Sequence, residues 1–186
     1  MKRFFDFSLA VFLIFVLWFI IIISAILVKI TSKGNALYWS DRVGINNKIF
    51  KMPKFRSMLI DTPAVATHLL DNPNVYLSPI GGFLRSTSLD ELPQLFSVLK
   101  GDMSFVGPRP ALYNQDDLIA LRTEKGVDKL LPGITGWAQV NGRDELSIPD
   151  KVALDVEYLN RQSFWFDVKI LWMTFLKVIK RDGVSH

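Results

Sequence analysis

The stretch RSTSLDELPQLFSVLKGDMSFVGPRP, from Arg85 to Pro110, decides which fold and chemistry we expect. Two adjacent carboxylates, Asp90 and Glu91, stand directly ahead of an apolar pattern with helical spacing. Four residues follow this spacing and are expected to face a core: Leu92, Leu95, Phe96 and Leu99. Pro93 suits a first helical turn, where backbone N–H groups lack partners, but not a helix interior. The helix should therefore start near Leu89 or Asp90, where an acid is kept ionised and can act as a nucleophile or a metal ligand.

The same residues also have a purely structural interpretation. Ser88 and Glu91 have the spacing of a capping box, which would make Asp90 an ordinary first-turn acid. Pro93 argues against this, because with Ser88 as the cap it would sit just past the first turn and remove a helical hydrogen bond. Three cations stand nearby and suggest anion binding, although cations are common on a basic protein: Arg85, Lys100 and Arg109. The local pattern leaves both interpretations open.

The composition fits one domain plus a membrane anchor. The 186 residues are 49% hydrophobic, and the excess is concentrated at the N-terminus. The chain has no cysteine, which excludes disulfides and thiolate metal sites. A net charge of +4 suits an anionic lipid surface or a phosphate-bearing substrate. The sequence has no dense basic stripe and no nucleic-acid motif, so we expect no nucleic acid among its partners.

The N-terminal segment reads MKRFFDFSLAVFLIFVLWFIIIISAILVKITSKG. It has no charge from Phe7 to Val28, and about 20 apolar residues are enough to cross a bilayer as a helix. Basic residues flank both ends, which fits a helix that returns to one face, and a spanning helix almost as well. Asp6, at the membrane edge, would need Lys2 or Arg3 as its partner. We predict a membrane-inserted helix at residues 1–33 and a cytoplasmic catalytic domain at residues 34–186.

The catalytic domain is predicted to be α+β and dominated by helices. Two short apolar runs within residues 38–58 surround a glycine and two asparagines, which indicates a β-hairpin. Its basic residues either form a solvated edge or point Lys54 or Arg56 at a phosphate. A loop or short helix is expected at residues 59–79, where His68, like the terminal His186, is taken as a surface residue.

Three further helices are expected, within residues 111–129, 147–160 and 163–181. Between the first two, the glycine-rich residues 131–146 predict a loop or hairpin, with Trp137 in the core. The last helix combines aromatic residues with a rim of lysines, which is typical of an amphipathic helix at a membrane interface. An ordinary core helix is the alternative.

Ordered motifs extend along nearly the whole chain: Lys2-Arg3, Asp6, Arg42-x-Gly44, Lys54 to Met58, Arg85-Ser86, Leu89 to Pro93, Lys100 to Phe105, Gly107 to Pro110, Pro132 to Gly136, Gln139 to Arg143 and Asp155. With these motifs the chain resembles the monotopic phosphoglycosyl transferases, the bacterial sugar transferase family that starts glycan assembly on polyprenyl phosphate. Its length is similar to that of the short members with a single catalytic domain. The best-studied of these break the N-terminal helix with a Ser-Pro pair. The aligned position here is Trp18-Phe19, so re-entrant and spanning helices both stay open.

The resemblance implies a transfer in two steps, in which Asp90 attacks the β-phosphate of a UDP-sugar and releases UMP. Polyprenyl (undecaprenyl) phosphate then displaces the phosphosugar from Asp90. Mg²⁺ would bridge Asp90 or Glu91 and the diphosphate. The implied place is the bacterial inner membrane, with the catalytic domain on the cytoplasmic face, where the soluble donor is found.

The resemblance also implies roles for other residues of these motifs. Arg85 is assigned to the lipid phosphate, while Lys54, Arg109 and Arg143 are assigned to the nucleotide diphosphate. Asp155 would either contact the nucleotide or support the site from behind. Candidate donors are UDP-linked N-acetylhexosamines, their dideoxy diamino relatives and hexoses such as galactose. Membrane lipids are further partners, and the apolar surfaces would permit a homodimer.

Two other classes of function compete with a transferase. A catalytically silent membrane scaffold of a glycan-assembly complex would have the same fold. It would not need the Asp90–Glu91 pair and the full set of cations, which argues against it. A membrane-tethered nucleic-acid binder rests on the pI of 9.3 alone, and it predicts salt-dependent DNA affinity that is indifferent to loss of Asp90.

Overall fold

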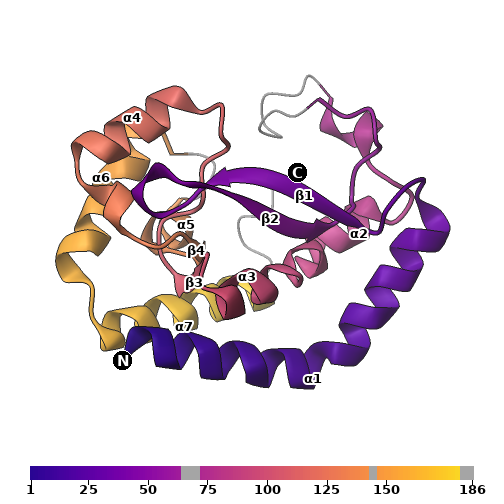
Figure 1. Ribbon diagram of the computed structural model, residues 1–186, viewed down its shortest axis with the longest axis horizontal. Coiled ribbons are helices and arrows are strands. Elements are labelled where there is room, and N and C mark those ends of the chain that lie inside the picture. Colours follow the sequence, from indigo (N-terminus) through magenta and orange to yellow (C-terminus); the bar gives the residue numbers. More distant parts are fainter. Residues whose placement is uncertain (64–71, 143–145, 181–186) are drawn as a thin grey trace.

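The computed structural model in Figure 1 describes residues 1–63, 72–142 and 146–180. Helices dominate the fold, and two small two-stranded sheets complete it, which confirms the predicted α+β class. The long helix α1 (Lys2–Thr31) lies along the lower edge of Figure 1, and the other elements lie above it. Three residues named from the sequence lie outside the described ranges: His68, Arg143 and His186.

Helix α1 is continuous over its 30 residues and turns upward along the right side of Figure 1. It buries four residues that recur at helical spacing on the side facing the rest of the fold: Asp6, Ala10, Ser24 and Val28. The rest of the helix surface is apolar and exposed, since only 11% of its most apolar 18-residue segment is buried against the rest of the protein. Helix α1 is therefore long and apolar enough to cross a membrane and is not a core helix.

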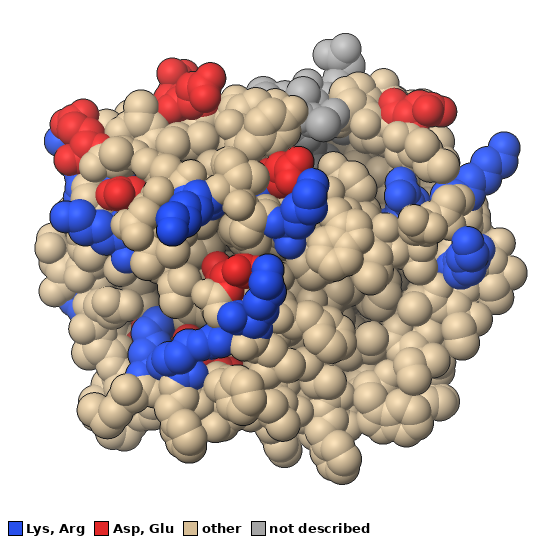
Figure 2. Space-filling view, in the orientation of Figure 1, with Lys and Arg blue, Asp and Glu red and all other residues tan. Residues whose placement is uncertain are grey.

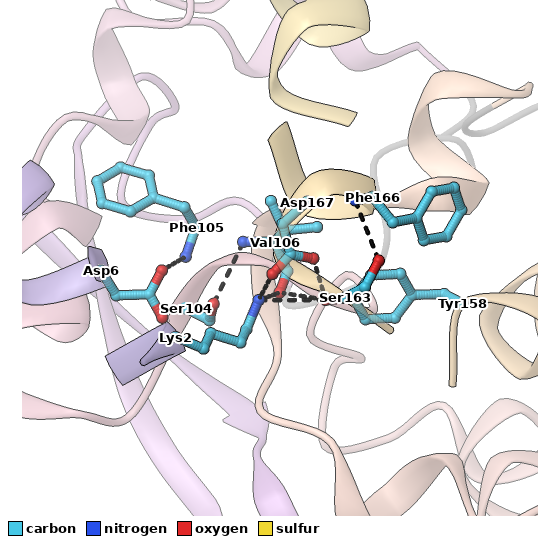
Figure 3. A network of polar contacts seen from close by, with 9 residues as sticks. All are labelled: Lys2, Asp6, Ser104, Phe105, Val106, Tyr158, Ser163, Phe166 and Asp167. Atoms are coloured by element: carbon cyan, nitrogen blue, oxygen red, sulfur yellow. Dashed lines mark hydrogen bonds and ion pairs between the residues drawn. The ribbon is translucent and has the colours of Figure 1, made fainter. Parts of the chain in front are cut away.

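Lys2, in the first turn of α1, is held by the network of polar contacts in Figure 3. Its Nζ donates to Asp167 Oδ2 at 2.5 Å, to the Val106 carbonyl at 3.0 Å and to the Tyr158 hydroxyl at 3.1 Å. The Tyr158 hydroxyl donates in turn to Asp167 Oδ1 at 2.7 Å. Burial and the neighbouring Asp167 raise the pKa of Tyr158, so the phenol stays a donor. The start of α1 is thus tied to the two C-terminal helices.

Two other residues of the first turns of α1 bind backbone groups. The Phe105 N–H donates to Asp6 Oδ1 at 3.2 Å, and the Arg3 guanidinium donates to the carbonyls of Val98 and Leu99. Among the contacts of the described residues, the partner of Asp6 is therefore the Phe105 N–H, and the expectation that it would be Lys2 or Arg3 is wrong. Near the other end of α1, Val28 packs in an apolar cluster with Phe55 and Leu84. Both ends of the helix therefore contact the rest of the fold.

The predicted hairpin is confirmed. Strand β1 (Leu37–Val43) pairs antiparallel with β2 (Ile49–Phe55), and the connection contains the 3₁₀ turn η1 (Ile45–Asn47). Asn46 and Asn47 have φ of 53° and 58°, a backbone region that asparagine tolerates better than most residues. Strand alternation puts Lys54 on the same face as the buried Met52, so Lys54 points inward.

Asp90 and Glu91 lie in a separate 3₁₀ turn, η4 (Leu89–Glu91), between the short helix α2 (Gly81–Ser86) and α3 (Gln94–Lys100). Pro93 is the N-cap of α3, so the predicted helix start near Leu89 or Asp90 is wrong, and the regular helix begins only at Gln94. Ser88 has φ of 56°, and its side chain makes no capping hydrogen bond among the described residues, so the capping box is not formed.

Three of the four residues expected to face a core do so, since Leu95 is buried and Leu92 and Leu99 pack against apolar clusters. Leu95 and Val98 are fully buried in the main core, whereas Phe96 is 49% exposed, so the expected core position of Phe96 is wrong. Because the regular helix begins only at Gln94, Leu95 and Val98 share the inward face and Phe96 points away from it.

The glycine-rich residues 131–146 were expected to form a loop or hairpin, and this is wrong. Strand β4 (Gly133–Thr135) pairs in parallel with β3 (Ser104–Val106), and the short helix α5 (Trp137–Val140) follows. Glycine permits this because the backbones nearly touch: a Cβ on Gly133 would lie 2.2 Å from the Gly107 nitrogen. The crossing fixes the direction of the chain leading to Arg109.

Gly133→Ala is expected to lower the free energy of unfolding by about 3 kcal/mol, since the added methyl group forces two backbone segments apart. Gly82→Ala in α2 is the matched control, because its Cβ would meet only Leu77 Cδ1, at 3.8 Å. That change should stay within about 1 kcal/mol and tend to stabilise the helix. Thermal unfolding of both variants measures the difference, and equal effects would contradict the close crossing.

The remaining helices are α4 (Asp116–Glu124), α6 (Ile148–Arg161) and α7 (Phe164–Lys180), with 3₁₀ turns η3 (Pro73–Tyr76) and η5 (Val127–Lys129). The helices agree with the predicted ranges, and half-buried Trp137 packs against the core. Helix α7 combines both interpretations of its sequence. It buries Phe166 and Ile170, and it exposes an aromatic side: Trp165, Trp172 and Phe175.

Candidate active site

Three separate segments supply the charged residues that surround the pair Asp90 and Glu91. Lys54 of β2 donates from Nζ to Glu91 Oε1 at 2.8 Å, and Arg109, in the segment after β3, approaches the same oxygen with Nη2 at 3.4 Å. Arg85 of α2 is close enough to act on the charge of Asp90. Five of the residues singled out from the sequence therefore form one cluster.

Asp90 is 8% exposed, and its titration reflects that burial. Burial raises the pKa of Asp90 from 3.8 to about 6; Lys54 opposes this shift, while the negative Glu91 adds to it. Arg85 and Arg109 also oppose the rise. The sequence had suggested an acid held ionised by a helix end, but desolvation outweighs that effect. Asp90 is still mostly ionised at pH 7, and it is a stronger base than an ordinary aspartate.

The cluster has the donors that a magnesium ion accompanying a diphosphate requires. Mg²⁺ is usually held by one or two carboxylates, with water and substrate phosphates completing its coordination. Asp90 and Glu91 supply two adjacent carboxylates that are electrostatically coupled. Within residues 1–63, 72–142 and 146–180 there is no group of three or more metal-binding side chains, so a metal held by protein groups alone is not supported there.

Arg42 of β1 belongs to the same cluster, although the sequence reasoning did not assign it to the site. Its Nε donates to Ser40 Oγ at 3.0 Å and its Nη1 to the Pro110 carbonyl at 3.1 Å. Burial and the nearby Arg109 lower the pKa of Arg42 to about 10, while Glu91 opposes this. Strand alternation, which places Arg42 on the inward face with Ser40, was the signal that could have found it.

Asp155 lies behind the cluster and is paired with a residue that the sequence did not single out. Arg122 of α4 donates to Asp155 Oδ2 of α6 from Nε at 2.9 Å and from Nη2 at 2.7 Å. Its Nη1 donates to the Arg109 carbonyl at 2.8 Å. The Asp155 side chain is only 2% exposed, which favours a supporting role over direct contact with a nucleotide. No local pattern predicts this pair, because 33 residues separate its members.

Asp155→Asn is expected to lower the free energy of unfolding by about 3 kcal/mol, since it leaves the Arg122 charge buried without a counter-ion. Asp102→Asn is the control: its partner Lys100 is 76% exposed, and such pairs contribute less than about 1 kcal/mol. Equal unfolding midpoints for the two variants would contradict the account of the buried pair.

Comparison with known proteins identifies the family of this chain. Residues 1–181 match the bacterial sugar transferase family. The chain belongs to this family. The resemblance drawn from the sequence motifs is thereby confirmed.

The bacterial sugar transferases similar to this chain differ in length. It is 40% identical to the uncharacterized sugar transferase EpsL of Bacillus subtilis (strain 168), over all of this chain and 91% of that protein. It is 39% identical to the UDP-glucose:undecaprenyl-phosphate glucose-1-phosphate transferase of Escherichia coli (strain K12), over 95% of this chain and 40% of that protein. It is also 39% identical to the undecaprenyl-phosphate galactose phosphotransferase of Salmonella typhimurium, over 83% of this chain and 36% of that protein. The chain thus spans less than half of the two relatives named for their reactions.

Proposed function

We propose that this protein transfers a sugar 1-phosphate from a UDP-sugar to undecaprenyl phosphate and releases UMP. The proposal rests on the surroundings of Asp90. This carboxylate is buried beside Glu91, has a raised pKa, and is surrounded by three cations: Lys54, Arg85 and Arg109. Family membership supports it, since relatives that share 39% of their aligned residues are named for this type of transfer to undecaprenyl phosphate. A scaffold without catalytic activity would not need Asp90, whose burial as a carboxylate lowers the free energy of unfolding.

The proposed reaction is a double displacement at phosphorus. A carboxylate oxygen of Asp90 attacks the β-phosphorus of the UDP-sugar, the bond to the bridging oxygen breaks, and UMP leaves with that oxygen. A phosphate oxygen of the lipid acceptor then attacks the same phosphorus, and the Asp90 carboxylate is regenerated. Lys54, Arg109 and the unplaced Arg143 are proposed to stabilise the diphosphate charge, and Arg85 the acceptor phosphate. The buried site makes these charges more effective than they would be in water.

Magnesium is a further part of the proposal. Asp90 and Glu91 would hold the ion, which would neutralise charge on the phosphate oxygens when bound. Glu91 already lies between Lys54 and Arg109, so the two cations would keep its carboxylate oriented when substrate and metal are absent.

The proposed location is the cytoplasmic face of the bacterial inner membrane, with α1 inserted and α7 lying at the lipid surface. Charged side chains occur over the upper, central, left and right parts of the face in Figure 2, whereas the bottom edge shows none in this view. Because both ends of α1 rest on the same body, we propose that the helix enters and leaves on one face. The chain has no cysteine, so single cysteines can test this cleanly. One at Asn35 and one added before Met1 should both react only from the cytoplasmic side, and labelling from opposite sides would indicate a spanning helix.

UMP release tests the function directly. The purified full-length chain in nanodiscs is incubated with Mg²⁺ and a panel of UDP-hexoses and UDP-N-acetylhexosamines, with and without undecaprenyl phosphate. We expect one donor to give a single stoichiometric burst of UMP without acceptor and many turnovers with it. A protein that releases no UMP from any donor under either condition would be a scaffold instead.

A further inference from the structure

A groove with only apolar atoms on its surface lies beside the membrane helix. Its lining is formed by four α1 side chains and one from α3: Val11, Ile14, Phe15, Trp18 and Leu99. The groove has a volume of about 530 Å³. Ile14 lies one turn after the buried Ala10 and packs against the main core, while the other three α1 side chains of the groove are exposed beside it. The groove therefore follows the seam between the apolar helix and α3, on the part of the molecule proposed to enter the membrane.

Helix α3 connects this groove with the candidate active site. Glu91 lies in η4, just before α3, and Leu99 lies in the last turn of α3, about 7.5 Å from Gln94 at 1.5 Å per residue. Phe96 lies one turn before Leu99 on the same side and is 49% exposed, whereas Leu95 and Val98 are buried. An exposed apolar side of α3 thus leads from the carboxylates and their cations to the groove.

We propose that the groove holds the isoprenoid chain of the lipid acceptor while the acceptor phosphate lies among the cations around Asp90. This inference rests on the proposed function, since it concerns the second substrate of the same site. An acceptor with an anionic head and an apolar tail matches this arrangement, because cations surround Asp90 ahead of α3 and the groove beside Leu99 is lined by apolar side chains. The nearby Arg3 guanidinium is bound to the carbonyls of Val98 and Leu99. The groove is shallow, since Phe15 and Trp18 are 77% and 55% exposed, but a chain in it would contact both α1 and α3, whereas the outer side of α1 offers contacts to one helix only.

Filling the groove tests the proposal without touching the charged site. Leu99→Trp and Ile14→Trp each place an indole in the groove, and Phe12→Trp on the outer side of α1, where Phe12 is 60% exposed, is the matched control. We expect the KM for undecaprenyl phosphate to rise about tenfold in the two groove variants and to stay unchanged in the control. The burst of UMP released without acceptor should be the same in all three.

The outcomes separate this inference from the proposed function. Equal KM values for groove and control variants, with a normal burst, would overturn the groove alone. Absence of the burst in the wild-type chain would overturn the proposed function and the groove with it.

A second measurement uses the unmodified chain and does not depend on how the variants fold. An undecaprenyl phosphate analogue with a diazirine on its first isoprene units is photolysed in nanodiscs, and the attached peptides are identified by mass spectrometry. We expect attachment within residues 11–18 or at Leu99 that excess undecaprenyl phosphate suppresses and excess phosphatidylglycerol does not. Suppression by both lipids alike would mean that ordinary membrane lipid occupies the groove, and it would overturn the proposal.

Discussion

Asp90→Asn is expected to lower kcat by about 10³-fold or more, because an amide cannot form the phosphosugar ester that the proposed mechanism requires. Affinity for the donor should change much less, since the surrounding cations remain. UMP release with and without undecaprenyl phosphate measures both quantities. A variant that retains more than a tenth of the wild-type turnover would show that Asp90 is not the nucleophile.

The same substitution should make the protein more stable at neutral pH. Burial raises the pKa of Asp90 from 3.8 to about 6, so ionisation of Asp90 opposes folding increasingly as the pH rises through this range. The opposition is absent below the pKa of an unfolded aspartate, where both states are protonated, and it reaches about 3 kcal/mol above pH 7. Asparagine does not ionise. Thermal unfolding should therefore show a gain for Asp90→Asn at pH 7.5 that disappears at pH 4, which also excludes misfolding as the cause of lost activity.

We expect Lys54→Met and Glu91→Gln to shift the acid limb of the pH–rate profile for UMP release in opposite directions. In the wild-type chain that limb should lie near pH 6, because the reaction needs ionised Asp90. Lys54 holds the pKa of Asp90 down, so its removal moves the limb to higher pH; Glu91 holds it up, so its removal moves the limb to lower pH. The rate at pH 7 should also fall, by about 10²-fold for Lys54→Met.

The control for this pair is Lys51→Met, on the same strand as Lys54. Lys51 is 69% exposed and pairs with Asp41 at the surface, so the pH profile should be unchanged. Steady-state rates between pH 4.5 and 9 distinguish the cases. Shifts in the same direction for Lys54→Met and Glu91→Gln would mean that the titrating group is not Asp90.

Local patterns predicted the elements whose structure depends on neighbouring residues. The hairpin followed from apolar runs around Asn46 and Asn47, and Pro93 indicated that a helix begins nearby, although not at which residue. Strand and helix periodicity act over a few residues, so the sequence displays them directly. Phe96 shows the limit of this reasoning, because a helix that starts four residues later than expected turns a different face to the core.

Contacts between distant segments could not be predicted in this way. Lys2 with Asp167 and Arg122 with Asp155 are each separated by tens of residues, and a lone charge in a sequence does not reveal its partner. The pKa of Asp90 depends on burial by several elements, which the local pattern of η4 does not contain. The family motifs named Asp155, but only the fold shows that Asp155 pairs with Arg122, which donates to the backbone carbonyl of Arg109.

The central claim is that Asp90 carries the phosphosugar between two substrates. The intact mass of the wild-type chain, measured after incubation with Mg²⁺ and the active UDP-sugar but no lipid acceptor, tests it most directly. We predict an increase equal to one sugar phosphate, located on Asp90 by peptide mapping, removed by undecaprenyl phosphate and absent from Asp90→Asn. An unmodified mass, together with continued turnover when the acceptor is added, would mean direct transfer between the substrates and would contradict the account.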